Sequence, residues 1–267
     1  MELAGKTVLL SGATGGLGRA IAVALASRDA RLVLSSRKPD ALEELARSLP
    51  GEGHRIAVAD LAEPGEPERL AAEAGGVDVL VANAGLPGTG RLESFSPEEV
   101  GRVVRVNLEA PIRMARELAP AMEAGGQGHL VFVSSLAGKA VSPRSSLYNA
   151  TKSGLRAFSL ALREDLWSAG VGVSVVLPGF VREAGMFHDS GAKPPPGVGT
   201  ITPEQVAEGV ITAIERNRAE VEVGSLALRA LSNFAMRRPE LAARIAYRRG
   251  RGTKIAERVA RGQADKR

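Results

Sequence analysis

Tyr148 and Lys152 lie four residues apart in the stretch "SSLYNATKSG" (residues 145–154), which consists mostly of small residues. On a helix, positions i and i+4 share one face, so the phenol and the ammonium group can meet. A nearby cation favours the phenolate and lowers a tyrosine pKa from its usual value near ~10. The pair therefore predicts a proton donor or acceptor, with an aromatic side chain resting on a surface helix as the alternative.

A glycine-rich turn, "SGATGGLGRAIAVAL", follows the first strand-like run of the chain. Gly12, Gly16 and Gly18 open a helical pattern there. Glycines allow a tight turn and close approach of the backbone to a pyrophosphate, whose charge is favoured at a helix N-terminus. Because the turn lies between a strand and a helix, it predicts a dinucleotide site, with simple packing as the alternative.

The second strand-like run ends in "SSRK", with Ser36 and Arg37 at its end and no acid before Asp40. Enzymes that use NAD usually place an acid here for the ribose hydroxyls, whereas a guanidinium binds a 2′-phosphate in bidentate fashion. We expect Asp40 to lie already in the next helix. The sequence therefore favours NADP, with NAD as the second choice and a solvated basic turn as the non-functional interpretation.

Apolar runs rich in Val and Leu alternate with amphipathic segments along the chain. The runs, typical of strands buried on both faces of a parallel sheet, are 6–12, 31–36, 54–60, 77–85, 128–135, 171–179 and 219–224. The helical segments are roughly 16–28, 39–49, 66–74, 97–124, 147–168 and 203–217. Strict alternation predicts an α/β fold: a doubly wound parallel sheet of the Rossmann type with about seven strands. We expect Pro111 to kink the helix over 97–124.

The domain division expected from this pattern is a dinucleotide-binding catalytic domain over 1–224 and a basic, helical C-terminal extension over 225–267. Residues 237–267 hold eleven Lys and Arg against three acids, a net of +8, so the total of +5 leaves −3 for the rest. The positive charge thus belongs to the extension, and nucleic-acid binding is not expected. The extension suits packing in an oligomer followed by a solvated tail; docking to an anionic membrane surface or an acidic carrier protein are the rival uses.

Composition excludes several classes of protein. The 267 residues include no cysteine, so disulfides and thiolate chemistry are excluded, and the three histidines show no metal-ligand spacing, so no metal site is expected. The chain shows neither a secretory leader pattern nor an apolar run of membrane-spanning length. We expect a cytoplasmic protein.

Six motifs together resemble those of the short-chain dehydrogenase/reductase family. They are the glycine turn, "NAG" at 83–85, Asn107 in "VRVNL", Ser135, Tyr148-x3-Lys152 and "PG" at 178–179, in family order over residues 6 to about 224. The resemblance implies that Tyr148 exchanges a proton with a carbonyl or alcohol oxygen and that Ser135 binds the same oxygen. It implies that Lys152 holds the nicotinamide ribose and that Asn107 holds a water molecule linked to Lys152.

The resemblance also implies a set of cofactor contacts beyond Tyr148 and Lys152. These are Gly12, Thr14, Gly15, Gly16, Leu17, Gly18, Ser36, Arg37, Asp60, Leu61, Asn83, Ala84, Gly85, Pro178, Gly179 and Val181. Asp60 would meet the adenine, and Val181 the nicotinamide amide. One departure is Glu183, where the family often has a threonine; another is the basic extension. The Gly- and Pro-rich segment 180–202, hereafter the lid segment, corresponds to the family's substrate cover.

These observations predict an NADP(H)-preferring oxidoreductase that interconverts a carbonyl and a secondary alcohol, assembled as a homo-dimer or homo-tetramer. A catalytically silent dinucleotide-binding regulatory or scaffold protein is the alternative from another class, and the presence of Ser135, Tyr148 and Lys152 argues against it. Among enzymes, a 3-ketoacyl-thioester reductase is the rival to a reductase of small ketones, sugars or steroids.

Overall fold

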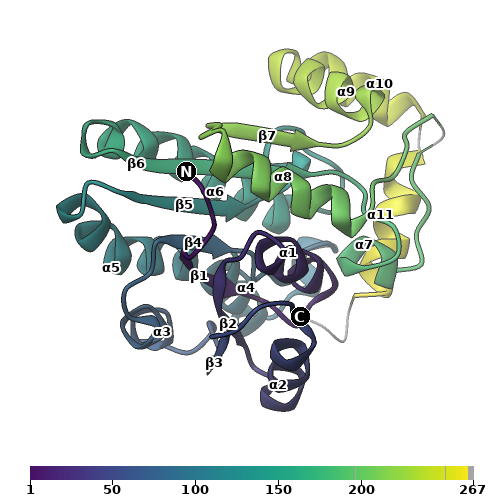
Figure 1. Ribbon diagram of the computed structural model, residues 1–267. Coiled ribbons are helices and arrows are strands. Elements are labelled where there is room, and N and C mark those ends of the chain that lie inside the picture. The colour runs from purple at the N-terminus through teal and green to yellow at the C-terminus, as the bar shows by residue number, and fades with distance from the viewer. Residues whose placement is uncertain (196, 250, 264–267) are drawn as a thin grey trace.

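Seven parallel strands form one sheet through the middle of the computed structural model, which describes residues 1–195, 197–249 and 251–263 (Figure 1). The strand order is β3-β2-β1-β4-β5-β6-β7. The strands are β1 (Thr7–Ser11), β2 (Arg31–Ser36), β3 (Arg55–Val58), β4 (Val79–Ala82), β5 (Gly128–Val133), β6 (Val171–Pro178) and β7 (Glu220–Val223). The predicted doubly wound α/β sheet is confirmed.

Helices cover both faces of this sheet (Figure 1). On one face, α1 (Gly16–Ala26), α2 (Pro39–Ser48) and α8 (Pro203–Glu215) share a core with β1 and β2. On the other, α3 (Glu66–Ala74), α5 (Ala110–Ala124) and α6 (Ser146–Leu166) share a core with β4, β5 and β6, and α4 (Pro97–Val104) lies against α6. The helices follow the predicted ranges closely because each buries the apolar stripe that its sequence carries.

Burial on both faces holds for the central strands and fails at the edges. Every residue of β4, β5 and β6 is buried, whereas β7 is half-buried throughout and β3 exposes Arg55 and Val58. An edge strand has a neighbour on one side, so part of its surface faces solvent. The outermost runs were thus predicted correctly as strands but not as fully buried ones.

The segment predicted as one helix over 97–124 is divided. After α4, residues Arg105–Glu109 form a single π-helical turn, η2, and α5 begins at Ala110. The predicted kink at Pro111 is therefore wrong in its form: Pro111 lies in the first turn of α5, and the irregular turn precedes it. Because proline has no N–H, it leaves the Asn107 carbonyl without the amide that an α-helix would supply four residues later.

Predicted helix starts are confirmed by two reciprocal caps. Ser96 accepts a hydrogen bond from the Glu99 amide while the Glu99 carboxylate accepts from the Ser96 amide, at the start of α4. Thr202 and Gln205 form the same arrangement before α8. Each cap satisfies backbone donors that would otherwise lack partners, so these helices begin where the sequence places them.

Three helices follow β7: α9 (Leu226–Arg237), α10 (Pro239–Arg249) and α11 (Arg251–Arg261). Figure 1 shows α9 along β7, while α11 turns back to lie beside α7 (Gly185–Asp189) of the lid segment. The extension is helical, as predicted; the division of the chain at residue 224 stays a prediction. Within the described ranges, no helix is long and apolar enough to span a membrane.

Candidate active site

The strand order reverses between β1 and β4, which opens a crevice at the carboxyl ends of these two strands. The two ends are tied together there. The Ser11 hydroxyl accepts hydrogen bonds from the Asn83 and Ala84 amides at 3.1 and 3.2 Å, and the Asn83 side chain donates to the Gly12 carbonyl at 3.2 Å. The "NAG" motif thus fixes the glycine turn against the neighbouring strand.

Ser135, Tyr148 and Lys152 meet at this same edge of the sheet. Ser135 follows β5 and caps the short helix η3 (Leu136–Gly138), whose Ala137 amide donates to the Ser135 hydroxyl at 3.1 Å. Tyr148 lies in the first turn of α6 and forms a hydrogen bond with Ser135. The single connection between β5 and β6 therefore brings together two residues that are thirteen positions apart in the sequence.

Lys152 lies one turn after Tyr148 on α6, with its Nζ 5.9 Å from the centre of the phenol ring. The side chain is almost fully buried, at 3% exposure, and Nζ donates to the Val133 carbonyl at 3.0 Å. No carboxylate among the described residues forms an ion pair with it. Burial lowers the pKa of Lys152 to about 8, because a low-dielectric environment disfavours the charged form.

Burial also raises the pKa of Tyr148 above its ordinary value, and the hydrogen bond with Ser135 opposes that shift without reversing it. The sequence predicted the opposite direction, on the ground that Lys152 would favour the phenolate. Desolvation of the phenol outweighs a cation that lies over the ring. In the protein without cofactor, Tyr148 therefore keeps its proton at neutral pH.

Asn107 contributes through its position in the π-turn rather than through a free side chain. Its amide group holds the backbone that follows the "NAG" motif: Oδ1 accepts from the Leu86 amide at 2.6 Å, and Nδ2 donates to the Leu86 carbonyl at 2.9 Å. The side chain predicted to bind water is thus already engaged. The backbone carbonyl of Asn107 receives no amide from the residue four positions later, because that residue is Pro111.

The glycine turn contains glycines that backbone packing requires and one glycine that is exposed to solvent. Gly12 has φ +67°, and a Cβ there would lie 2.8 Å from the Ala84 Cα; a Cβ on Gly18 would lie 2.1 Å from the Gly12 carbonyl oxygen. These two residues must therefore be glycine for the backbone to pack. Gly15 instead is exposed and caps α1 without a side chain, so the first amides of the helix face a space that an anion can enter.

The lid segment lies against the glycine turn and the neighbouring "NAG" motif. A Cβ on Gly16 would lie 2.3 Å from the Ala184 Cβ, and one on Gly85 would lie 3.4 Å from the Met186 Cε and 3.6 Å from Lys152 Nζ. Glycines thus line a path from the glycine turn to Lys152, with Ala184 and Met186 covering it. Helix amides at one end of this path and a buried ammonium group at the other are groups that can bind the pyrophosphate and the ribose of a dinucleotide.

Two arginines converge on Asp60, the residue that the family resemblance would place at the adenine. Asp60 Oδ2 lies 3.6 Å from Arg37 Nη1 and 3.9 Å from Arg102 Nη2, and Oδ1 accepts from the Ala62 amide at 3.0 Å. Arg102 was missed by sequence reasoning because it lies in the amphipathic pattern of α4, far along the chain. Its Nε is buried and has no hydrogen-bond partner in the described part of the chain.

The other predicted contacts lie along the same crevice. The Pro178 carbonyl accepts from the Ser135 hydroxyl at 3.3 Å, and the Gly179 amide donates to Val223. Half-buried side chains belong to Thr14, Leu17 and Ser36; buried ones belong to Leu61 and Val181. Glu183 has φ +71°, a conformation uncommon for a residue with a side chain, and its carboxylate pairs with Arg182 in solvent.

The opposite edge of the sheet holds none of the predicted residues. A hollow of about 500 Å³ lies there between the N-terminus and the start of β5, lined by residues such as Met1, Lys6 and His129. Burial lowers the pKa of His129 to about 3, and its ring lies 2.8 Å from the Ser174 hydroxyl, which makes it a neutral packing residue. Within the described ranges, no cluster of three or more His, Asp or Glu could hold a metal ion.

Comparison with known proteins gives consistent matches. The sequence model for short chain dehydrogenases matches residues 6–194. Ketoacyl reductase HetN of Nostoc sp. (strain PCC 7120) is 37% identical over 227 residues, covering 83% of this chain and 79% of that relative. A solved short chain dehydrogenase/reductase family protein gives a TM-score of 0.77 at 28% identity, covering 85% of this chain and 100% of that one. A metagenomic short-chain oxidoreductase, solved with NADP, gives a TM-score of 0.69 at 31% identity, with coverage of 85% and 100%.

Proposed function

Since this chain belongs to the short-chain dehydrogenase/reductase family and is an oxidoreductase, we propose that it is an NADP(H)-preferring enzyme that interconverts a carbonyl group and a secondary alcohol. One observation carries the proposal: Tyr148, hydrogen-bonded to Ser135, lies over a buried Lys152 that has no described carboxylate partner. Perturbed titratable groups that converge in a crevice are typical of catalytic sites.

Tyr148 is the proposed acid and base. Because burial raises its pKa, the phenol is protonated at neutral pH and can donate that proton to a carbonyl oxygen during reduction. Ser135 would donate a second hydrogen bond to the same oxygen and so orient it. In the reverse direction, the phenolate would accept the proton of the alcohol.

Lys152 would bind the cofactor ribose and stabilise the phenolate that forms after proton transfer. Its ammonium group donates one hydrogen bond to the Val133 carbonyl, which leaves two N–H donors for other partners. The Asn107 carbonyl in the π-turn would hold a water molecule from which the proton on Tyr148 is restored. A bound nicotinamide dinucleotide would supply or accept the hydride.

The glycine turn would hold the cofactor's pyrophosphate at the N-terminus of α1, and Asn83, Ala84 and Gly85 would line its adenine ribose. Because Ala184 and Met186 lie against this cradle, cofactor binding would move the lid segment outward. The preference for NADP rests on Arg37 after β2, with Arg102 beside it, since both guanidinium groups can bind a 2′-phosphate.

Arg37→Ala tests the cofactor preference. The affinity for NADPH should fall roughly 10- to 150-fold, the effect of a lost charge-assisted hydrogen bond, whereas NADH binding should hardly change. Fluorescence titration with both cofactors measures this, and Lys38→Ala, on the neighbouring exposed lysine, is the matched control. Equal weakening of both cofactors by Arg37→Ala would show that Arg37 does not bind the phosphate.

Among carbonyl substrates, a 3-ketoacyl thioester is the second candidate, favoured by the name of the relative that is 37% identical. A reductase of small ketones or sugars is the first. The proposal is tested by incubating the purified protein with NADPH and a panel of ketones, sugars and a 3-ketoacyl thioester, and following the loss of nicotinamide absorbance. Turnover of at least one carbonyl is expected; cofactor binding without turnover across the panel would favour the regulatory or scaffold alternative.

Two further parts of the prediction belong to this proposal: assembly as a homo-dimer or homo-tetramer, and action in the cytoplasm. Oligomers are common in this family. Light scattering after size-exclusion chromatography measures the assembly, and fractionation of the source cells locates the protein. A monomer at working concentration, or recovery outside the cytoplasmic and inner-surface fractions, would contradict them.

A further inference from the structure

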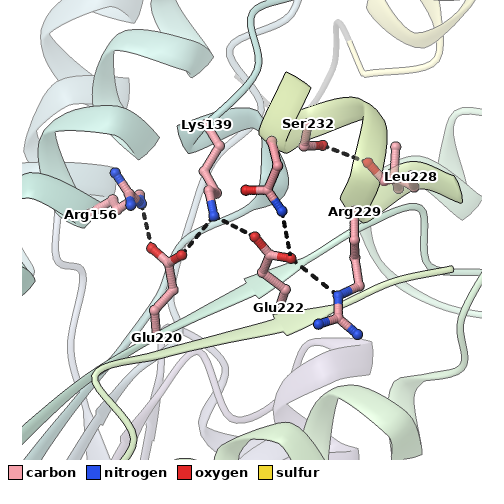
Figure 2. Close-up of polar contacts among 8 residues, drawn as sticks. Lys139, Arg156, Glu220, Glu222, Leu228, Arg229 and Ser232 are labelled. Carbon is pink, nitrogen blue, oxygen red and sulfur yellow. Dashed lines mark hydrogen bonds and ion pairs between the residues drawn. The ribbon is translucent and has the colours of Figure 1, made fainter. Parts of the chain in front are cut away.

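Helix α9 places three of its polar side chains, Arg229, Ser232 and Asn233, on the side toward the sheet. Arg229 Nε lies 3.1 Å from Glu222 Oε2 of β7 (Figure 2). Asn233 Nδ2 donates to the same oxygen at 3.4 Å. Ser232, at 2% exposure, donates to the Leu228 carbonyl at 2.9 Å. A helix on a protein surface ordinarily buries its apolar stripe and exposes its polar one. In α9, Leu228 packs against the core, but most of the larger apolar side chains stay exposed.

A buried ionic network fixes this orientation. Lys139, whose side chain is 5% exposed, pairs with both Glu220 and Glu222, and Arg156 pairs with Glu220 (Figure 2). Burial works to raise the pKa of Glu222, but hydrogen bonds from Lys139 and Arg229 hold it below the usual value. If α9 rolled to bury its apolar side, it would withdraw Arg229 from a carboxylate that is 10% exposed. The helix is therefore held with its apolar side outward.

The outward side of α9 is an uncharged apolar stripe. Leu226 is 80% exposed, Leu231 52% and Phe234 37%, and Ala227 and Ala230 are exposed between them. These five residues, hereafter the α9 stripe, share one face of the helix by their spacing. The next helix continues the exposure with Leu241 and Ile245. Contiguous exposed apolar residues of this kind mark an interaction surface.

Positive charge accompanies the stripe. Arg237 and Arg238 at the end of α9 and Arg244 on α10 are exposed, against one exposed acid, Glu240. Residues 237–267 carry a net of +8, whereas residues 1–236 carry −3. The partner of this surface must therefore accept apolar side chains and supply negative charge.

We infer that the α9 stripe and its flanking arginines form a docking surface for an anionic lipid membrane, with α9 lying in the plane of the headgroups. Such a surface takes Leu and Phe side chains at the acyl boundary and attracts arginines through the negative potential of its lipids. A second copy of the chain fits less well. An isologous contact would bring the same patch of both copies face to face, so one interface would carry the flanking arginines of both, and this excess of positive charge disfavours association.

The negative charge of the rest of the molecule gives the docked protein a direction. Residues 1–236 would be repelled by the anionic surface while the extension is attracted to it. The sheet and the crevice would therefore lie above the membrane, with β7 and α9 on the membrane side. This association is peripheral and depends on ionic strength, because exposed charges are screened by salt.

The test is sedimentation of the full-length protein with vesicles of phosphatidylcholine alone and of phosphatidylcholine mixed with phosphatidylglycerol. We expect binding to the mixed vesicles, little binding to phosphatidylcholine, and loss of binding as salt is raised. The double variant Leu231→Ser with Phe234→Ser should bind the mixed vesicles at least about tenfold more weakly. Leu92→Ser, on a similarly exposed leucine far along the chain (58%), is the matched control and should bind like the parent.

A second variant tests the charges: Arg237→Glu with Arg238→Glu should abolish binding, whereas Arg116→Glu on α5 should not. Circular dichroism and thermal melting should be unchanged for all variants, since the substituted side chains are exposed. Absence of binding to mixed vesicles would overturn the inference. So would unchanged binding by the Leu231 and Phe234 variant, or a fall in its size-exclusion mass with vesicle binding retained, which would make the stripe a contact between copies.

Discussion

Two buried lysines of this protein have opposite surroundings. Lys139, in the ionic network next to β7, pairs with Glu220 and Glu222. Lys152, in the crevice, donates to the Val133 carbonyl and pairs with no carboxylate among the described residues. Both lie on segments that follow β5, and both side chains are nearly inaccessible to solvent.

The difference separates a structural charge from a functional one. A buried ammonium group that is fully paired contributes no reactivity, because its field is cancelled by its partners. One that is left unpaired keeps its field for whatever enters the site, and its own pKa shifts toward neutrality. The fold therefore keeps the buried charge of Lys152 without a carboxylate partner in the crevice, whereas it neutralises the buried charge of Lys139 with two glutamates.

The largest effect is expected from Lys152→Met, which removes the unpaired buried charge. Turnover should fall by roughly 10²- to 10⁴-fold, because the proton transfer at Tyr148 loses its electrostatic support. The melting temperature should stay level or rise, since an unpaired buried charge is removed. Steady-state rates and thermal melting of the same preparation measure the two effects. A large loss of stability with retained turnover would make Lys152 structural.

Lys139→Met should produce the reverse pattern. Removing Lys139 leaves Glu220 and Glu222 with less neutralising charge, and breaking a buried pair typically costs about 3–5 kcal/mol of unfolding free energy. Turnover per folded molecule should stay within a few-fold, because Lys139 contacts none of the proposed catalytic side chains. Urea unfolding measures the loss, and Arg116→Met, at an exposed pair on α5, is the control. An unchanged unfolding curve would contradict the network's role.

The sequence predicted the crevice better than it predicted this network. Strand runs, glycine turn and the Tyr148–Lys152 spacing are local patterns, and parallel topology brings strand ends to one edge whatever the details. Lys139 and Glu222 are 83 positions apart, and nothing in the local pattern of "EVEV" says that a lysine from another crossover will reach it. Their pairing follows from packing, which a single sequence does not reveal.

The structure of the C-terminal extension was still harder to predict from the sequence. Apolar residues at helical spacing in α9 predict a face but not its direction, and the direction is decided by Arg229 and Glu222 across a tertiary contact. The expectation of a solvated tail is wrong around α11: Ala256 on this helix and Gln263 just after it are buried, and Gln263 Nε2 donates to the Met186 carbonyl of the lid segment at 2.8 Å. Similarly, the raised pKa of Tyr148 reflects burial, which the spacing from Lys152 cannot report.

The pH dependence of folding stability, a smaller effect, tests the unpaired charge of Lys152 without any substrate. Because the folded pKa of Lys152 is lowered to about 8 from 10.5, the unfolded chain binds more protons between these values. Folding stability should therefore rise as the pH increases through this range, by up to about 3 kcal/mol, and the penalty is fully present below it. The raised pKa of Tyr148 has the opposite effect on folding stability, which it lowers as the pH rises above about 10.

Denaturant unfolding of the cofactor-free protein between about pH 7 and pH 10 measures this rise, and subtracting the curve of Lys152→Met isolates it from other groups. The difference between parent and variant should shrink steadily as the pH increases. A difference that does not depend on pH would mean that Lys152 titrates normally and that its charge is compensated.

The most direct test of the account is Tyr148→Phe, which removes the transferable proton and keeps the ring. With a carbonyl that the parent reduces, turnover should fall at least about 100-fold, the usual contribution of general acid catalysis. NADPH affinity, measured by fluorescence titration of the same sample, should stay within about twofold, because the ribose partner Lys152 and the glycine turn are untouched. Turnover within about twofold of the parent would contradict the assignment of Tyr148 as the proton donor, and with it the proposed mechanism.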